Sequence, residues 1–152
     1  MTNPPVHARI EEHPFLYGLG KAFLKELHPL TTEHEFHTGA TIAREGDPAH
    51  KFGLIVKGKV GLEVVAHDRP RLTVLTLGPG EVFGWSWLVP PHRWRVDVRA
   101  LKPTHVLMIS GDGLLRAFEA HPADAYQFLR RLVPVLGQRL DATRLQVLDV
   151  HR

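Results

Sequence analysis

The spacing of apolar residues changes twice along this chain, and the three resulting segments predict different secondary structure. Between Pro14 and Leu30 the apolar residues recur at steps of three and four, which places them on one face of a helix. Gly18 and Gly20 interrupt the pattern, so we expect one or two short helices over residues 14–30. The residues that carry this pattern are Phe15, Leu16, Leu19, Phe23, Leu24 and Leu27.

Over residues 31–110 the pattern becomes one of short apolar runs separated by turns that contain glycine or proline. Val60–Val64 and Leu72–Thr76 alternate apolar and polar residues on either side of the turn sequence His67–Pro70, which predicts a β-hairpin. A later pair of runs is separated by a second turn signal at Lys102–Pro103. We therefore expect about eight short strands, arranged as a β-sandwich or roll.

Helical spacing returns after Ser110 and continues to the C-terminus, so we expect C-terminal helices over residues 111–150. Ser110 or Asp112 is placed to cap the first of these helices, and His121–Pro122 is placed to end it and begin the next. The apolar residues of the last helix are Phe128, Leu129, Leu132, Val133, Leu136, Leu140 and Val147.

Composition supports a single β-rich domain over residues 1–152. A chain of this length with 43% hydrophobic residues can bury one core but is too short for two ordinary domains. Its 13 glycines and 12 prolines suit many short strands joined by tight turns. The absence of cysteine excludes disulfides and thiolate-bound metal sites.

Charge and hydropathy indicate a cytoplasmic protein without a membrane partner. The chain has neither the pattern of a secretory signal nor an apolar run near the roughly 20 residues of a membrane span. Its 19 basic and 16 acidic residues are interleaved, which is typical of a solvated surface. In the last helix the basic residues Arg130, Arg131, Arg139, Arg144 and Arg152 are offset by Asp124, Asp141 and Asp149.

Three segments spaced around glycines together resemble the opening strands of cyclic-nucleotide-binding domains. They are Phe36–Ile42, Glu45–Asp47 and Leu54–Val60, and the later run Leu77–Gly84 is similar to the lead into that family's phosphate-binding cassette. The resemblance covers roughly residues 14–150. It implies a mainly β fold with flanking helices, namely a double-stranded β-helix (jelly roll) between N- and C-terminal helices.

The chain is also similar to the sensory half of catabolite-activator-type and oxygen-responsive transcription regulators. In those proteins a long last helix pairs two subunits and leads into a DNA-reading winged helix-turn-helix. No residues remain here for such a part, so we expect no nucleic-acid partner. The segment Gly84–Trp94 resembles a bacterial subgroup of stand-alone domains.

The resemblance also indicates how the binding site departs from the family. In nucleotide-binding members a cassette glycine precedes a glutamate that binds the ribose hydroxyl, and an arginine on the return strand pairs with the phosphate. Gly84 matches the glycine, but Trp85 stands at the glutamate position and Trp94 at the arginine position. Because tryptophan has one N–H donor and no acceptor, we expect cyclic AMP to bind weakly or not at all.

Two orientations of the return strand remain open. If Trp94 faces inward, the pocket is aromatic and either closed or suited to a planar apolar ligand. If a shift of one residue turns Arg93 or Arg95 inward, the pocket can hold an anion. We favour the inward tryptophan. The candidate ligand-binding residues are Gly84, Trp85, Ser86, Trp87, Arg93, Trp94 and Arg95, although the three tryptophans also suit simple packing.

The sequence does not predict an enzyme, a catalytic residue, a metal ligand or a cofactor other than a cyclic nucleotide or another small anionic ligand. Glu33–His37 superficially resembles the ligands of a metal-dependent cupin-like enzyme. His34 and His37 are three residues apart, however, so on a strand they point to opposite faces. We therefore expect a non-catalytic regulatory or sensory domain. The alternative is a ligand-free dimerisation protein that acts on an unknown protein partner.

The last helix predicts a homodimer. Its apolar stripe, which includes Leu132, Leu136 and Leu140, is longer than a small roll can cover. Each large side chain left exposed forgoes roughly 1.5–3 kcal/mol of burial free energy, so pairing with a second copy is favoured. The alternative is that the helix folds back across its own roll.

Overall fold

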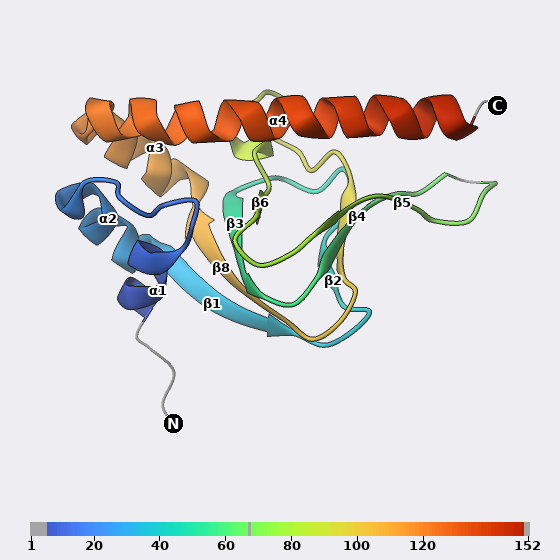
Figure 1. The fold of residues 1–152 in the computed structure, drawn as a ribbon, viewed down its shortest axis with the longest axis horizontal. Coiled ribbons are helices and arrows are strands. Elements are labelled where there is room, and N and C mark those ends of the chain that lie inside the picture. Colours follow the sequence, from blue (N-terminus) through green and yellow to red (C-terminus); the bar gives the residue numbers. More distant parts are fainter. Residues whose placement is uncertain (1–5, 67, 151–152) are drawn as a thin grey trace.

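The computed structural model describes residues 6–66 and 68–150, with side chains described at 9–66 and 68–142. Within these residues, eight strands form two antiparallel sheets of four, with helices at one end and along one side (Figure 1). The strands are β1 (Thr31–Phe36), β2 (Thr41–Ala43), β3 (Lys51–Lys57), β4 (Val60–Val64), β5 (Leu72–Leu77), β6 (Val82–Phe83), β7 (Asp97–Ala100) and β8 (Thr104–Ser110). The helices are α1 (Val6–Glu12), α2 (Lys21–Leu27), α3 (Gly111–Ala120) and α4 (Pro122–Val150), with short 3-10 turns η1 (His28–Leu30) and η2 (Ser86–Leu88). The expected jelly roll is confirmed.

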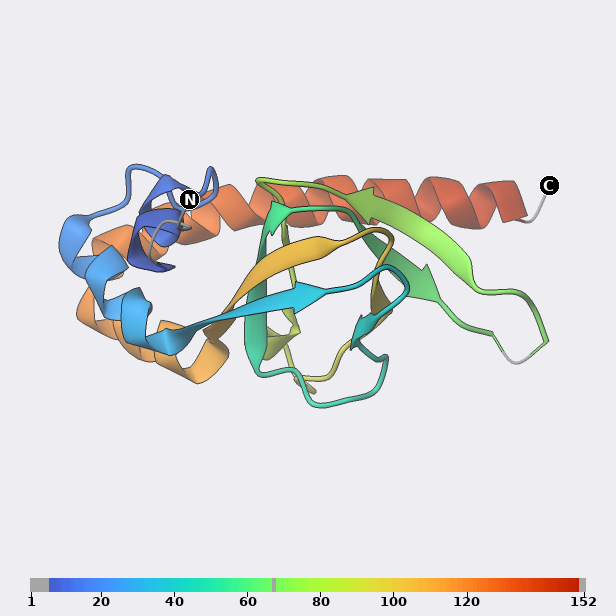
Figure 2. The ribbon, with the colours of Figure 1, turned by 90° about the horizontal axis from the view of Figure 1, so that it is seen from below.

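Both sheets combine strands that are distant in the sequence. The first sheet has the order β1-β8-β3-β6 and the second the order β2-β7-β4-β5. The predicted hairpin is confirmed, since β4 and β5 pair with Val60 opposite Leu77 and Leu62 opposite Leu75. Figure 2 shows this hairpin extending away from the roll toward the same end as the last turns of α4. The strands on either side of Lys102–Pro103 lie in different sheets, so the chain changes sheets at this turn.

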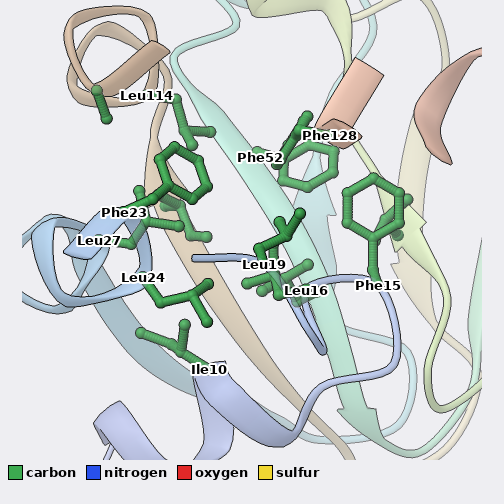
Figure 3. Close-up of a cluster of buried hydrophobic side chains, with 14 of the residues drawn as sticks. Ile10, Phe15, Leu16, Leu19, Phe23, Leu24, Leu27, Phe52, Leu114 and Phe128 are labelled. Atoms are coloured by element: carbon green, nitrogen blue, oxygen red, sulfur yellow. The ribbon is translucent and has the colours of Figure 1, made fainter. Parts of the chain in front are cut away.

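The larger hydrophobic core lies where the helices meet the first sheet (Figure 3). Phe52 of β3 and Phe128 of α4 are fully buried, and the ring centroid of Phe15 lies 5.5 Å and 5.0 Å from theirs. Truncating such a buried aromatic side chain typically costs about 3–5 kcal/mol. The core thus fixes the first half of α4 against the roll, and the helix then continues along β5.

The N-terminal helices differ from the sequence expectation. The first helix, α1, precedes residue 14, and a turn over residues 14–18 separates it from α2. Phe15 and Leu16 are nevertheless buried, because the amides of Leu16 and Tyr17 both donate to the carbonyl of His13 and turn their neighbours inward. A compact turn can therefore bury residues at a helix-like spacing without forming a helix.

The C-terminal helices begin as the sequence predicts. Ser110 caps α3, because its hydroxyl accepts a hydrogen bond from the amide of Gly113 at 3.1 Å. Pro122 is the first residue of α4. No helix in the described part of the chain is long and apolar enough to cross a membrane.

The apolar stripe of α4 is divided between the roll and solvent. Leu132 is buried and Leu136 is partly buried against the helical core, so this part of the stripe is covered by the protein's own chain. By contrast, Val133 is 62% exposed and Leu140 is 63% exposed. The side chain of Val147 lies outside the described residues. The roll therefore covers the stripe at Leu132 and Leu136 but not at Val133 and Leu140.

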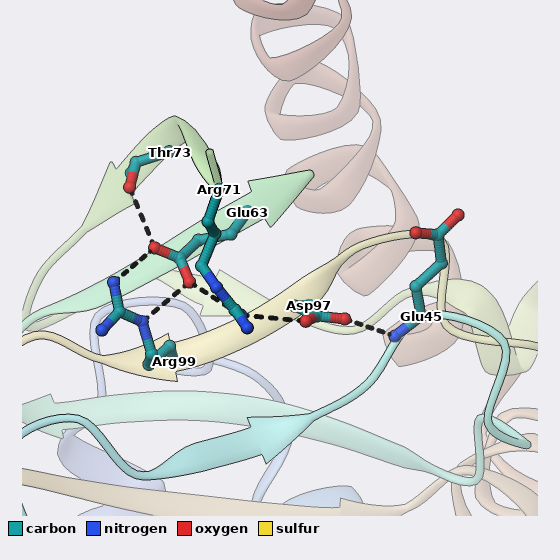
Figure 4. A network of polar contacts seen from close by, with 6 residues as sticks. All are labelled: Glu45, Glu63, Arg71, Thr73, Asp97 and Arg99. Carbon is teal, nitrogen blue, oxygen red and sulfur yellow. Dashed lines mark hydrogen bonds and ion pairs between the residues drawn. The ribbon is translucent and has the colours of Figure 1, made fainter. Parts of the chain in front are cut away.

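A polar network occupies the outer face of the second sheet (Figure 4). The side chain of Glu63 is 1% exposed, and its two carboxylate oxygens accept hydrogen bonds from Nε and Nη2 of Arg99, both at 2.8 Å. Thr73 and Arg71 donate to the same carboxylate, at 3.0 and 3.3 Å. Arg71 also pairs with Asp97 at 3.0 Å. The network joins β4, β5 and β7 across their outer surface.

Candidate functional site

A cavity of about 390 Å³ lies between the second sheet and α4. This volume falls at the lower end of the range of small-molecule sites, roughly 300–1,000 Å³. Residues from four parts of the chain line it, namely Leu62, Val74 and Leu75 from the β4–β5 hairpin; Gly84, Trp85 and Ser86 after β6; Trp94, Arg95, Val96 and Val98 leading into and along β7; and Leu136, Arg139 and Leu140 from α4. The walls are therefore mostly apolar.

Strand alternation explains why the hairpin and β7 present apolar side chains to this cavity. Leu62 of β4 lies opposite Val98 of β7, and both side chains are buried. The adjacent positions, Glu63 and Arg99, project to the outer face and form the polar network. A single pair of strands thus contributes to both the cavity and the outer salt bridges.

The turn after β6 brings the chain close to Trp94. Gly84 has a φ of +84°, a conformation that side chains rarely adopt. A Cβ at this position would lie 2.7 Å from Cη2 of Trp94 and 3.0 Å from the carbonyl oxygen of Lys51. Position 84 therefore requires glycine, and the Trp94 indole lies directly against the turn that resembles the family's cassette.

Trp94 faces inward, as the favoured orientation predicts. It is 9% exposed, and its ring centroid lies 6.3 Å from that of Phe83. Two backbone hydrogen bonds hold it in place: its amide donates to the carbonyl of Asp47 at 2.9 Å, and its carbonyl accepts from the amide of Gly46 at 2.8 Å. An aromatic ring therefore fills this inner corner of the cavity.

The two arginines beside Trp94 have different surroundings. Both are exposed, but Arg93 donates to the carbonyl of Gly46 at 2.8 Å and does not line the cavity. Arg95 donates to the carbonyl of Pro90 at 3.3 Å and lies on the cavity wall. Arg95 thus lines the cavity although Trp94 faces inward. The structure therefore has one feature of each of the two orientations that the sequence left open.

The tryptophans after Gly84 also separate. Trp87 is 4% exposed and packs in the helical core, with its ring centroid 6.0 Å from that of Phe52. The packing interpretation therefore holds for Trp87, which does not line the cavity. Trp85 and the buried Ser86 do line it. Of the seven candidate residues, the structure gathers Gly84, Trp85, Ser86, Trp94 and Arg95 and leaves Trp87 and Arg93 outside.

Arg139 is the cavity residue that the sequence interpretation placed incorrectly. The interleaved charges of the last helix indicated a solvated face, yet this side chain is 7% exposed and lines the cavity. Its Nη2 donates to the carbonyl of Val82, and its Cζ lies 5.5 Å from the centroid of the Trp85 ring. Burial lowers the pKa of Arg139 to about 10, and the charge of Glu81 partly offsets this effect. The side chain therefore remains a cation at neutral pH.

Histidines and carboxylates are not gathered as metal ligands in the described residues. His34, which the cupin-like alternative used, is exposed, and its Nε2 lies 2.9 Å from the hydroxyl of Thr32. Glu33 pairs instead with Arg9. Glu33 and His34 therefore make their contacts on β1, which is an edge strand of the first sheet, and His37 lies just beyond this strand.

Comparison with known proteins agrees with this architecture. The sequence matches the family model described as the cyclic nucleotide-binding domain over residues 33–121, from β1 to just beyond α3. A putative cyclic nucleotide-binding protein from Geobacter metallireducens has a similar structure, with a TM-score of 0.76 and 27% identity. That comparison covers 91% of this chain and 99% of the other.

Two curated relatives are longer than this chain. A CRP-like cAMP-activated global transcriptional regulator from Mycobacterium tuberculosis is 26% identical over 129 residues, which are 85% of this chain and 54% of the regulator. Glutaminase 1 from Bradyrhizobium diazoefficiens is 30% identical over 138 residues, which are 91% of this chain but 22% of the glutaminase. The chain thus spans only part of each relative. By its family match and its fold, the chain belongs to the cyclic nucleotide-binding domain family.

Proposed function

We propose that this chain is a non-catalytic, cytoplasmic sensory domain in which a small ligand occupies the cavity and α4 transmits its presence to a protein partner. The observation that carries the proposal is the shared wall of the cavity. Leu136, Arg139 and Leu140 of α4 face the same space as the turn after β6. A ligand there contacts the roll and the helix together, so its binding free energy depends on how the two are placed.

We further propose that cyclic AMP is a poor ligand. Trp85 supplies no acceptor for a ribose hydroxyl, and Trp94 covers Gly84 at the corner where the family resemblance places the phosphate. Losing a charged contact to a partly buried phosphate costs on the order of 2 kcal/mol, and losing the ribose acceptor adds to this, so affinity falls by about a thousandfold.

Isothermal titration calorimetry against a panel of cyclic mono- and dinucleotides tests this assignment. We expect no submicromolar dissociation constant for cyclic AMP. A submicromolar value would contradict the altered cassette, although it would leave a sensory role intact. If neither the nucleotides nor any other small ligand binds, the proposed sensory role is wrong. The alternative, a ligand-free dimerisation protein, then describes the chain better.

The exposed part of α4 supports a homodimer as a second element of the function. Val133 is 62% exposed and does not line the cavity, so the variant Val133→Glu tests pairing separately from ligand binding. We expect light scattering at micromolar concentration to give twice 17.1 kDa for the wild type and 17.1 kDa for the variant. Gln127→Glu, at another exposed position of α4, is the matched control. A monomeric wild type would contradict the dimer.

A further inference from the structure

The two described charged side chains that line the cavity are both positive, and the carboxylate whose charge acts on Arg139, that of Glu81, lies outside the lining. Among the described residues that line the cavity, the ionisable side chains are Arg95 and Arg139, and no carboxylate is present. Arg139 is nine-tenths buried, so its guanidinium carries positive charge where little water can screen it. A ligand that contacts this wall gains from carrying negative charge.

The remaining walls favour a flat apolar body. Trp85 and Trp94 approach the cavity from the two ends of the cassette loop, while Leu62, Val74 and Leu136 line other parts of it. Aromatic side chains prefer aromatic partners in offset-stacked or edge-to-face arrangements, and such pairs add about 0.5–1.5 kcal/mol beyond simple burial. Sugar hydroxyls would find few acceptors on these walls, because the polar side chains there are a serine and two arginines.

The position of Arg139 specifies where the acidic group of a ligand would lie. Its guanidinium stacks over the Trp85 ring and reaches the carbonyl of Val82, so it is held at the junction of α4 with the turn after β6. A guanidinium has five N–H donors in a planar fork, and a carboxylate accepts two of them in parallel. A carboxylate at this junction would therefore have charged N–H donors within the same wall as the aromatic rings.

We propose that the cavity binds a planar aromatic carboxylate, with its rings against Trp85 and Trp94 and its carboxylate on Arg139. This inference rests on the proposed sensory function and names the chemical class of its ligand. It also assigns the ligand's counter-charge to α4, whereas the family resemblance places a phosphate-binding arginine on the return strand. The acidic group of the ligand therefore contacts the helix directly.

The desolvation of Arg139 supports this assignment. Burial lowers the pKa of its guanidinium, which means that the folded protein stabilises the charge less well than water does. An anion bound within hydrogen-bonding distance restores that stabilisation, and charge-assisted hydrogen bonds to a guanidinium are roughly twice as strong as neutral ones. Binding of a neutral ring of the same shape would leave this cation as it is.

The first experiment compares three probes on the wild-type protein by isothermal titration calorimetry. 2-Naphthoate supplies a planar double ring with a carboxylate, 2-naphthamide has the same shape without the charge, and decalin-2-carboxylate has the charge without the flat rings. We expect 2-naphthoate to bind at least about tenfold more tightly than 2-naphthamide, because the charged hydrogen bonds are lost in the amide. Decalin-2-carboxylate is expected to bind about threefold more weakly or worse, because it cannot stack.

The second experiment locates the charge recognition. In Arg139→Gln we expect the affinity for 2-naphthoate to fall to that of 2-naphthamide, while the affinity for 2-naphthamide changes little. Arg139→Lys is expected to retain part of the preference, since it keeps the charge but not the planar fork. Arg130→Gln is the matched control, because Arg130 is exposed on the same helix and its guanidinium stacks over Tyr126.

The outcomes separate this inference from the proposed function. Equal binding of the naphthoate and the naphthamide to the wild type overturns the carboxylate assignment even if the variants fail to fold, since that comparison needs no mutation. A preference that survives Arg139→Gln overturns the role of Arg139. Tight binding of a cyclic nucleotide with no binding of 2-naphthoate overturns the ligand class but leaves a sensory domain. Absence of binding by every probe overturns both.

Discussion

The two faces of the second sheet hold buried charges in opposite ways. On the outer face, the carboxylate of Glu63 is surrounded by Arg99, Thr73 and Arg71, and all of these contacts lie within the chain (Figure 4). On the inner side, Arg139 of α4 donates to the carbonyl of Val82 and lies over the Trp85 ring, on an apolar cavity wall whose other described ionisable residue is Arg95.

The pKa directions reflect this difference. Hydrogen bonds from Arg99 lower the pKa of Glu63, and the same contacts raise the pKa of Arg99. At Arg139, burial instead lowers the pKa. The outer site therefore stabilises its charges and contributes to folding, whereas the inner site holds a charge at a cost. A charge that burial destabilises beside a cavity, as at Arg139, indicates a ligand site more strongly than a charge that is stabilised by its neighbours, as at Glu63.

The largest expected effect follows from breaking the outer network. Glu63→Gln removes the charge that Arg99 and Arg71 share, and we expect the free energy of unfolding to fall by about 2–3 kcal/mol. The loss stays below that of a fully buried pair because both arginines are more than a third exposed and regain water. Urea unfolding followed by circular dichroism measures it. Glu45→Gln is the control, since Glu45 enters the network only through its backbone amide.

A smaller effect is expected when acid titrates the same carboxylate. The pKa of Glu63 is lowered in the folded state, so its stabilisation is present in full above its ordinary value of 4.5 and is lost as the pH falls through the lower native pKa. Urea unfolding repeated from pH 6 to pH 3 should therefore show a steeper loss of stability in the wild type than in Glu63→Gln. Parallel pH profiles would show that the network is not electrostatic.

His13 extends the comparison to a buried group that is held neutral. Its Nδ1 accepts from the amide of Phe15 at 3.2 Å, which places the proton on Nε2, 3.0 Å from the carbonyl of Ile55. Burial lowers its pKa below the ordinary value of 6.5, so below that pH the unfolded chain binds a proton that the folded chain resists. Stability should therefore fall from pH 7.5 toward the lower native pKa. His13→Gln should flatten this part of the profile, and an unchanged slope would assign the effect elsewhere.

The smallest expected effect on stability comes from Arg139→Gln without ligand. Removing this cation loses contacts that include its hydrogen bond to Val82 and its contact with the Trp85 ring, but it also removes the cost of burying a charge, so the free energy of unfolding should change by less than about 1 kcal/mol. Urea unfolding beside Glu63→Gln gives the direct contrast. A loss as large as that of Glu63→Gln would show that Arg139 is a structural residue, and the comparison of the two faces would no longer hold.

Local patterns in the sequence were sufficient for much of the roll. Alternation in Val60–Val64 and Leu72–Thr76 places every second side chain on one face, and together with the turn signal at His67–Pro70 it predicted the hairpin. The sequence also favoured the inward orientation of Trp94 over a shifted strand, and Trp94 and Val98 are both buried. The cap at Ser110 and the start of α4 at Pro122 follow from the chemistry of helix ends, which depends on a few adjacent residues.

Long-range contacts decided which of the similar residues reach the cavity. Trp85 and Trp87 are two positions apart and have the same chemistry, yet the first lines the cavity and the second packs on Phe52 of β3. Arg130 and Arg139 both follow the helical pattern of a solvated face, but only Arg139 meets the turn after β6. A periodic sequence determines which residues share a face of a helix or strand. Which element covers that face depends on contacts between distant segments, so only the tertiary structure could place Arg139 beside Trp85.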